Sequence, residues 1–324
     1  MSLSRRDWLL LALGAGGGAA AAGLARVRGA VPRLARVPDS PRAVRDSLYG
    51  TMLEPPADCG PGIMDPLTTP PPRGAPGTPI TLAVQEGPVE VAHAQLMPAW
   101  TFNGRIPGPV LRATEGDALT VRFRNLGAHP HNLHFHGTHA LPSDGWQPVP
   151  PGGEATVAFT AGPAGLHPYH CDMTPAPEHI SHGLYGAMLV DPRAPRPPAR
   201  EVVLVLGGYD LDGDGKSELY GWNGVAGYYM KFPVKVRAGE LVRAYIVNMV
   251  ADEPVISFHL HAQVFDVYPG GMGDRPAWRA DVLTLATAER AIIEFRLPDR
   301  GRYMFHPHQA RLAERGAMGW FAAV

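Results

Sequence analysis

The feature that most constrains the fold of this 324-residue chain is an internal repeat. RATEGDALTVRFRNL, at 112–126, aligns with VRAGELVRAYIVNM at 236–249, and HNLHFH at 131–136 aligns with ISFHLH at 256–261. The two copies are about 125 residues apart, which is the length of one domain. The repeat therefore predicts two copies of the same domain in tandem.

Both copies are predicted to be all-β. Segments such as LTVRFRNL and AIIEFRL alternate or run apolar with β-branched residues, and Gly, Pro and Asn bound them. The 38 Gly and 35 Pro favour many short strands joined by turns. We predict tandem Greek-key β-sandwich domains at 79–193 and 200–324, joined by the Pro/Arg-rich linker RAPRPPARE.

The N-terminus is predicted to be a targeting segment followed by an arm. Residues 1–26 resemble a twin-arginine export signal, with Arg5 and Arg6 ahead of an apolar Leu/Ala/Gly stretch. A retained membrane anchor is the alternative, but the stretch is shorter than a membrane span requires. Residues 27–78 are rich in Pro, Arg and Ala and predict an extended arm. We expect a periplasmic or extracellular mature protein without a stable membrane span, and the net charge of −1 gives no indication of nucleic acid binding.

Histidines are the candidate functional residues. The chain has 14 of them, and they include three His-x-His pairs: His134 with His136, His259 with His261, and His306 with His308. Residues i and i+2 of a strand point to the same face, so each pair presents two imidazoles together. Imidazole is a good ligand for copper, zinc, iron and nickel. The pattern predicts a shared metal centre.

A second ligand set occurs only in the first copy of the repeat. His131 and Cys171 align with Ile256 and Pro307, and His179 has no counterpart. Two imidazoles and one thiolate form the trigonal set that favours blue copper. The position of the usual weak axial ligand is Leu184, whose side chain cannot coordinate; we expect this to raise the copper potential.

On these motifs the chain resembles the cupredoxin-fold multicopper oxidases, which include laccases and are related to copper nitrite reductases. The resemblance covers about 80–324 and rests on FNGRIPGPVLRATEGDALTVRFRN, HFHG, FHLHAQVF and HISHGLYG. It is closest to the two-domain subclass with blue copper in the first domain. In that subclass homotrimers form a trinuclear copper cluster between subunits.

The resemblance implies a laccase-like copper enzyme. One-electron donors (phenols, metal ions or a redox protein) would reduce type 1 copper, and O2 would be reduced to water at the cluster. About four coppers per chain are implied: one type 1, one type 2 and two type 3. The implied ligands are His131, Cys171 and His179 with Leu184 axial for type 1, His134 and His259 for type 2, and His136, His170, His261, His306 and His308 for type 3. Asp144 resembles the acid that delivers protons to reduced oxygen.

One position departs from the family pattern. Oxidases of this type have His-Cys-His, whereas this chain has His170-Cys171-Asp172 and therefore one cluster imidazole fewer. Asp172 either coordinates as a carboxylate or leaves the cluster short of copper. His167 and His182 are close in sequence and are candidates to replace the missing imidazole.

Two other functions stay open. A copper nitrite reductase, which converts nitrite to nitric oxide, needs one three-histidine type 2 copper, which His136, His170 and His306 would supply. In that family an aspartate usually stands where this chain has His134, and Met usually stands at Leu184, so both positions favour the oxidase. An electron-transfer or copper-storage cupredoxin is the third candidate.

Two weaker features complete the predictions. DLDGDGKSE, at 210–218, resembles the start of a calcium loop, but its closing position holds Gly221, so a strand-connecting turn is the better interpretation. Cys59 has no partner within the chain if Cys171 binds copper.

Overall fold

The computed structural model describes residues 68–74 and 77–324. The proposed export signal, Cys59 and most of the predicted arm lie outside this range. No helix within it is both long enough and apolar enough to cross a membrane.

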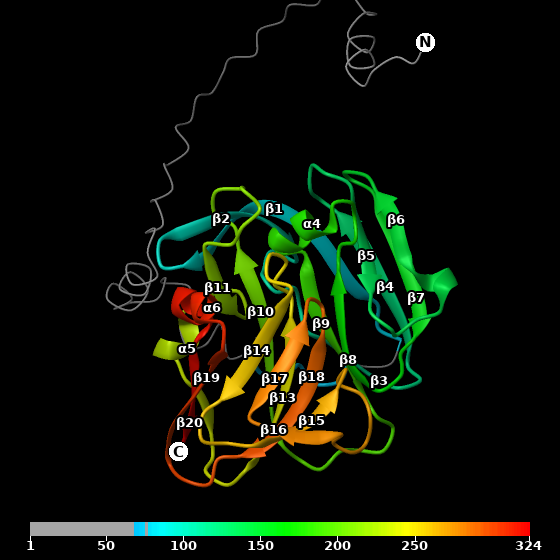
Figure 1. The fold of residues 1–324 in the computed structure, drawn as a ribbon. Coiled ribbons are helices and arrows are strands. Elements are labelled where there is room, and N and C mark those ends of the chain that lie inside the picture. The colour runs from blue at the N-terminus through cyan, green and yellow to red at the C-terminus, as the bar shows by residue number, and fades with distance from the viewer. Residues whose placement is uncertain (1–67, 75–76) are drawn as a thin grey trace, which may run out of the picture. The chain divides into compact units, whose positions relative to one another are not determined.

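The first half of the described chain is a sandwich of two sheets (Figure 1). One sheet has the strand order β2-β1-β4-β7, and the other has the order β3-β9-β8-β5-β6. The strands are β1 (Ile80–Ala92), β2 (Gln95–Phe102), β3 (Leu111–Thr114), β4 (Ala118–Asn125), β5 (His131–Phe135), β6 (Gly145–Val149), β7 (Glu154–Thr160), β8 (Gly165–His170) and β9 (Tyr185–Asp191). In β4, Val121 and Phe123 face the core between the sheets, and the arginines between and after them are exposed. This alternation is the reason that LTVRFRN forms a strand of a sandwich.

The second half repeats this plan with its own pair of sheets, ordered β11-β10-β13-β18-β15-β16 and β12-β20-β19-β14-β17. The strands are β10 (Arg200–Tyr209), β11 (Leu219–Trp222), β12 (Val234–Val236), β13 (Leu241–Asn248), β14 (Val255–Leu260), β15 (Phe265–Pro269), β16 (Trp278–Ala280), β17 (Val282–Ala286), β18 (Arg290–Arg296), β19 (Gly301–Pro307) and β20 (Gly319–Ala323). The helical segments of the two halves are short: η1 (Leu141–Ser143), α4 (Ala176–Ser181), α5 (Tyr228–Lys231), α6 (Ala310–Leu312) and η2 (Ala313–Ala317). The predicted all-β class is confirmed.

The repeat in the sequence is also a repeat in strand pairing. In the first half β1 pairs parallel to β4 and β3 pairs parallel to β9. In the second half β10 pairs parallel to β13 and β12 pairs parallel to β20. Each parallel pair has its counterpart at the same point of the other sandwich, so the aligned histidine motifs occupy equivalent strands, β5 with β14 and β8 with β19.

Strand β10 is buried on both of its faces. Val202, Leu204 and Leu206 pack into the core of the second sandwich. Val203 and Val205 pack instead into a cluster that also contains Leu166, Tyr185 and Leu189 of the first sandwich. The run VVLVL is therefore continuously apolar because each of its faces meets a different core.

An ion-pair network also joins the two halves. Arg112 on β3 donates hydrogen bonds of 2.8 Å to Asp191 Oδ2 and 2.9 Å to Glu201 Oε2. Glu201 belongs to β10, so one guanidinium ties the end of the first sandwich to the first strand of the second. Although burial lowers the pKa of Arg112, these two carboxylates outweigh that effect and raise it. The network is part-buried and joins a guanidinium to carboxylates, so its hydrogen bonds are of the strong, charge-assisted kind.

Candidate copper centre

The structure brings together the three residues of the predicted type 1 set. His131 opens β5, Cys171 follows β8 directly, and His179 lies in the short helix α4. Cys171 Sγ is 3.8 Å from His131 Nδ1 and 3.3 Å from His179 Nδ1, and the two histidine nitrogens are 3.2 Å apart. All three side chains are buried. Two imidazole nitrogens and one sulfur thus converge on one small space, and this donor set fits copper.

The surroundings of Cys171 suit a metal thiolate. Its Sγ accepts a hydrogen bond of 3.4 Å from the backbone N–H of Asn132, and its own N–H donates to the carbonyl of Leu184 at 3.0 Å. Burial raises the pKa of the free thiol to about 11, and a coordinated metal reverses this by removing the proton. Leu184 is fully buried in the same apolar cluster and offers no ligand atom.

Sequence analysis missed Glu86, which lies against the far side of His131. Glu86 Oε1 accepts hydrogen bonds from His131 Nε2 at 3.3 Å and from His129 Nδ1 at 3.0 Å. Burial raises the pKa of Glu86, but these hydrogen bonds and those of two backbone amides outweigh burial and lower it. A carboxylate on the other nitrogen fixes the orientation of an imidazole ligand. Nothing in the sequence marks Glu86, which is 45 residues from His131.

Trp100 is the second residue that the sequence gave no reason to select. Its ring packs edge-on against both histidines of the predicted type 1 set, with centroids 5.1 Å from His131 and 4.8 Å from His179. Its face stacks on His182, with centroids 4.2 Å apart. His182 in turn borders a cavity of about 390 Å³ that Glu178, Asp214 and other polar residues line. Trp100 therefore connects the predicted type 1 set to a cavity at the surface.

A second group of imidazoles lies on the same sheet and includes His170, the residue before Cys171. His136 Nε2 is 2.7 Å from His170 Nε2, and His134 completes a group whose ligand atoms all lie within 4.8 Å of one another. His134 Nδ1 is 2.9 Å from Asp144 Oδ1, and His170 Nδ1 is 3.0 Å from the carbonyl of Cys171. These contacts leave Nε2 of both rings available to a metal. Burial, with the neighbouring His170 and His134, lowers the pKa of His136 to about 3, so this imidazole is neutral at physiological pH.

The second sandwich carries the matching group. His259, His261 and His306 present ligand atoms within 4.8 Å of one another, and His261 Nε2 is 3.0 Å from His306 Nε2. This pair is the counterpart of His136 and His170. His308 is exposed and its ring lies 5.0 Å from that of His259. Both halves thus gather imidazoles at equivalent strand ends, as the three His-x-His pairs predict.

The structure gives no support to Asp172 as a carboxylate ligand, or to His167 and His182 as replacements for the missing imidazole. Asp172 is exposed and belongs to none of the groups of metal-ligating side chains within the described part of the chain. His167 is buried with Nδ1 at 2.9 Å from the carbonyl of His136 and Nε2 at 2.8 Å from that of Pro163. His182 stacks on Trp100, beside the predicted type 1 set. Both nitrogens of His167 are therefore engaged by the backbone, and His182 lies at the wrong site.

The acidic loop between β10 and β11 is a connecting turn, as interpreted from its sequence. Asp210, Asp212, Asp214 and Glu218 come within 4.8 Å of one another there. The carboxylate of Asp210 accepts backbone hydrogen bonds from Gly213 and Gly215, at 2.7 and 2.8 Å. The loop thus uses Asp210 to hold its own backbone.

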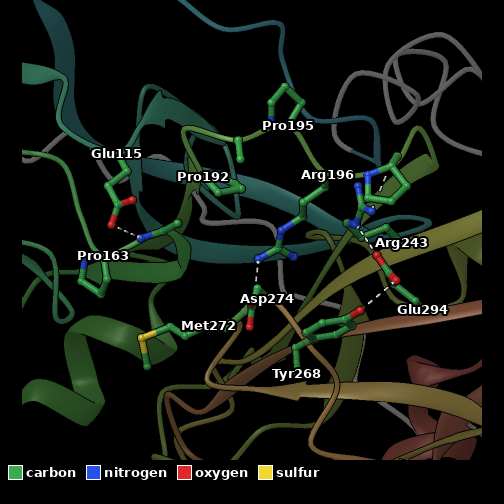
Figure 2. Close-up of a pocket in the computed structure, with 14 residues that line it drawn as sticks. Glu115, Pro163, Pro192, Pro195, Arg196, Arg243, Tyr268, Met272, Asp274 and Glu294 are labelled. Atoms are coloured by element: carbon green, nitrogen blue, oxygen red, sulfur yellow. Dashed lines mark hydrogen bonds and ion pairs between the residues drawn. The ribbon is translucent and has the colours of Figure 1, made fainter.

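A larger cavity, of about 550 Å³, is lined by residues of the linker and of both sandwiches (Figure 2). Arg196 lies there with its guanidinium 5.6 Å from the centre of the Tyr268 ring. None of the predicted copper ligands lines it. The candidate chemistry therefore resides in the histidine groups and not in this cavity.

Comparison with known proteins agrees with this geometry. Family models described as multicopper oxidase match residues 83–195 and 196–324. A solved structure of a multicopper oxidase is 40% identical, with a TM-score of 0.76, and the match covers 78% of this chain and 94% of that one. A copper nitrite reductase structure from Nitrosomonas europaea is 28% identical, with a TM-score of 0.72, and the match covers 76% and 94%.

Curated relatives include copper-containing nitrite reductases. That of Neisseria meningitidis is 31% identical over 245 residues, which cover 68% of this chain and 62% of the relative. That of Alcaligenes xylosoxydans is 33% identical over 202 residues, covering 60% and 56%. The match spans less than two thirds of the length of either relative. Because the two family models together match most of the chain, this protein, with its two cupredoxin-like sandwiches, belongs to the multicopper oxidase family.

Proposed function

We propose that this protein is an oxidase that takes single electrons from a reducing substrate at type 1 copper and reduces O2 to water at a trinuclear copper cluster. The observation that carries the proposal is the pair of equivalent histidine groups. Each half of the chain presents three imidazoles with ligand atoms within 4.8 Å of one another, and His308 adds a fourth ring to the second group. Copper bound there would supply the redox chemistry.

The number of imidazoles favours the oxidase over a nitrite reductase. A three-histidine copper site needs only His136, His170 and His306. It leaves four histidines without a role, although each packs against another histidine ring at 4.9 to 5.3 Å between centroids: His134, His259, His261 and His308. Imidazoles gathered in this way are the usual ligands of a copper site.

We propose that the cluster closes between copies of the chain. No group of ligating side chains among the described residues combines histidines of both halves. His261 and His308 of the second half are exposed in the single chain. A partner copy that brings its first-half group against this surface would complete the ligand set, as in the homotrimers that the family resemblance implies. Light scattering of the copper-loaded protein would give the number of subunits.

Electrons would enter beside Trp100 and leave through His170. An electron donor bound in the cavity would contact the ring of His182, which stacks on Trp100. The ring of Trp100 in turn packs against His131 and His179. From Cys171 the route to the cluster would pass through the backbone to the preceding residue, His170, and the hydrogen bond from His170 Nδ1 to the Cys171 carbonyl would shorten it. Electron transfer then needs no side-chain motion.

Asp144 is suited to hold a proton near the cluster. Its carboxylate accepts a hydrogen bond of 2.9 Å from His134 Nδ1, and its side chain keeps 18% of its surface exposed. It therefore touches both a predicted ligand and solvent. We propose that it passes protons from water to oxygen as the oxygen is reduced, which is the role that the family resemblance implies.

A copper nitrite reductase is the second candidate. The curated relatives named above favour it, and so does Asp172, which stands exposed where a cluster histidine is expected. In this case His136, His170 and His306 would hold the single type 2 copper. The mature protein would work outside the cytoplasmic membrane in either case, given the proposed export signal.

The test combines copper content with two activities. Protein reconstituted with excess copper is assayed for copper per chain, for O2 consumption with a phenolic donor, and for nitric oxide from nitrite. The variants His261→Ala and His308→Ala are compared with His93→Gln, which alters an exposed histidine in the turn after β1.

An oxidase loses O2 consumption in both cluster variants and keeps it in the control. Nitric oxide production that survives in both variants, with two coppers per chain or about that number, overturns the oxidase proposal. A single type 1 copper with neither activity would point to an electron-transfer or storage protein instead.

A further inference from the structure

The structure contains a further histidine that the ligand assignment leaves unused. His139 follows the HFHG motif and precedes η1, and its ring packs against that of His134 with centroids 5.8 Å apart. Its ligand atom, together with those of His134 and Asp144, forms a group within 4.8 Å. The predicted cluster lacks one imidazole, and this residue adds one beside a predicted ligand.

The hydrogen bonding of His139 matches that of two predicted copper ligands. His139 Nδ1 lies 3.1 Å from the carbonyl oxygen of the next residue, Ala140. His170 and His306 make the same contact with the carbonyls that follow them, at 3.0 and 2.8 Å. In each case Nδ1–H donates its hydrogen bond to a backbone carbonyl, so the lone pair of each ring is on Nε2. Metal-ligating histidines are commonly oriented in this way.

The Nε2 atom of His139 is the unusual feature of this ring. It is buried and has no hydrogen-bond partner among the described residues. A buried nitrogen without a partner is destabilising, so such atoms are rare in folded proteins. A metal ion bound to that lone pair would remove this destabilisation.

Adding His139 also gives the two halves the same number of neighbouring imidazole rings. The second half gathers four imidazole rings, because His308 lies 5.0 Å from His259 and 5.3 Å from His306. The first half has three without His139 and four with it. Asp172, the residue that replaces the usual histidine, is exposed and joins no group.

We propose that His139 supplies, through Nε2, the additional imidazole ligand to the copper held by His134. The proposal rests on the proposed function, since that copper belongs to the cluster. Asp144 orients His134 from its Nδ1 side, and the Ala140 carbonyl orients His139 in the same way. The loop after HFHG would then add an imidazole at the type 2 copper, whereas the position that Asp172 occupies belongs to the type 3 set.

The experiment compares His139→Ala and His139→Gln with the control His93→Gln. Each full-length protein is loaded with copper, and three quantities are measured: copper per chain, the EPR spectrum of type 2 copper, and the type 1 absorption band. We expect His139→Ala to weaken the binding of type 2 copper about 10-fold or more while the type 1 band is unchanged. Free imidazole should restore the type 2 signal in this variant.

Unchanged type 2 hyperfine coupling and copper affinity in His139→Ala would overturn the proposal and show that the ring only packs against Phe159, 5.8 Å away. If His139→Ala also loses type 1 copper, its fold is damaged. The type 2 hyperfine coupling and the copper affinity of His139→Gln then test the proposal instead. If the wild-type protein itself shows no type 2 copper, the proposed function fails and this inference with it.

Discussion

His170 and Cys171 are consecutive residues whose side chains belong to two different groups. Cys171 Sγ lies 3.3 Å from His179 Nδ1, whereas His170 Nε2 lies 2.7 Å from His136 Nε2. The end of β8 separates them, because successive side chains of a strand point to opposite faces. One peptide unit therefore joins the predicted electron acceptor to the predicted site of oxygen reduction.

Replacing the Cys171 thiol should remove copper from the type 1 site and leave copper in the histidine groups. We expect Cys171→Ser to abolish the type 1 absorption band, because a hydroxyl is a poor ligand for copper in this trigonal site. The histidine groups should keep their copper, which EPR and metal analysis would report. Loss of all copper in Cys171→Ser would contradict the separation of the two groups, with His93→Gln as the reference for an unaffected protein.

Glu86 should tune the type 1 copper. Its carboxylate accepts a hydrogen bond from His131 Nε2, which makes the imidazole a better donor and stabilises oxidised copper. We expect Glu86→Gln to raise the type 1 reduction potential and to lower copper affinity by about 10-fold. A redox titration followed at the blue band measures the first effect, and copper competition measures the second.

The matched control for this prediction is Glu154→Gln, which alters a carboxylate paired with Arg124 at the surface. That variant should leave the potential unchanged. A Glu86→Gln protein with the wild-type potential would show that this hydrogen bond has no electronic effect on the ligand.

Leu184 should keep the reduction potential of type 1 copper high. Its fully buried side chain offers no axial donor, and Leu→Met is a volume-conserving change that costs less than about 1.5 kcal/mol. We expect Leu184→Met to lower the type 1 potential, because a thioether at this position stabilises oxidised copper. Leu189→Met, in the buried strand β9, is the control for an added thioether elsewhere. Equal type 1 reduction potentials in the two variants would show that Leu184 does not occupy the axial position.

The copper-free protein should lose stability as the pH falls. Burial, with its histidine neighbours, holds the pKa of His136 at about 3 and that of His179 at about 4, whereas an unfolded histidine titrates near 6.5. Between these values the unfolded chain binds more protons, so folding stability rises with pH. Each histidine should cost about 2 kcal/mol or less at pH 5 relative to pH 7.5.

Urea unfolding in the presence of a chelator, at these two pH values, measures this effect. The midpoint should be lower at pH 5, and His136→Gln should reduce the difference because a neutral amide does not titrate. Identical midpoints in the wild-type protein would contradict the neutral, buried state of these two rings.

Much of the architecture was accessible from local pattern. Strands that alternate as β4 does, with Val121 and Phe123 inward, identify a sandwich from a few residues. The repeat also predicted that His134 and His259 occupy equivalent positions, since duplicated domains place aligned residues on equivalent strands. It also isolated His131, Cys171 and His179 as features of one copy only. In each case the information is contained in short segments or in their comparison.

Other features depend on contacts between distant segments. Glu86 meets His131 across 45 residues, and Trp100 on β2 meets His179 of the helix α4. His167 looked available by its position, yet the backbone engages both of its nitrogens. Hydrogen-bond partners of this kind are fixed by packing, which no local pattern encodes.

The sequence by itself thus determined the two sandwiches, the histidine pairs and the His-Cys-Asp departure from the family pattern. Periodicity, repetition and ligand chemistry act at short range along the chain, and all three can be read from residue types. Tertiary structure alone decided the carboxylate behind His131, the buried lone pair of His139 and the double-sided burial of β10. These arise where strands far apart in sequence pack together, and only the folded chain brings their side chains within hydrogen-bonding distance.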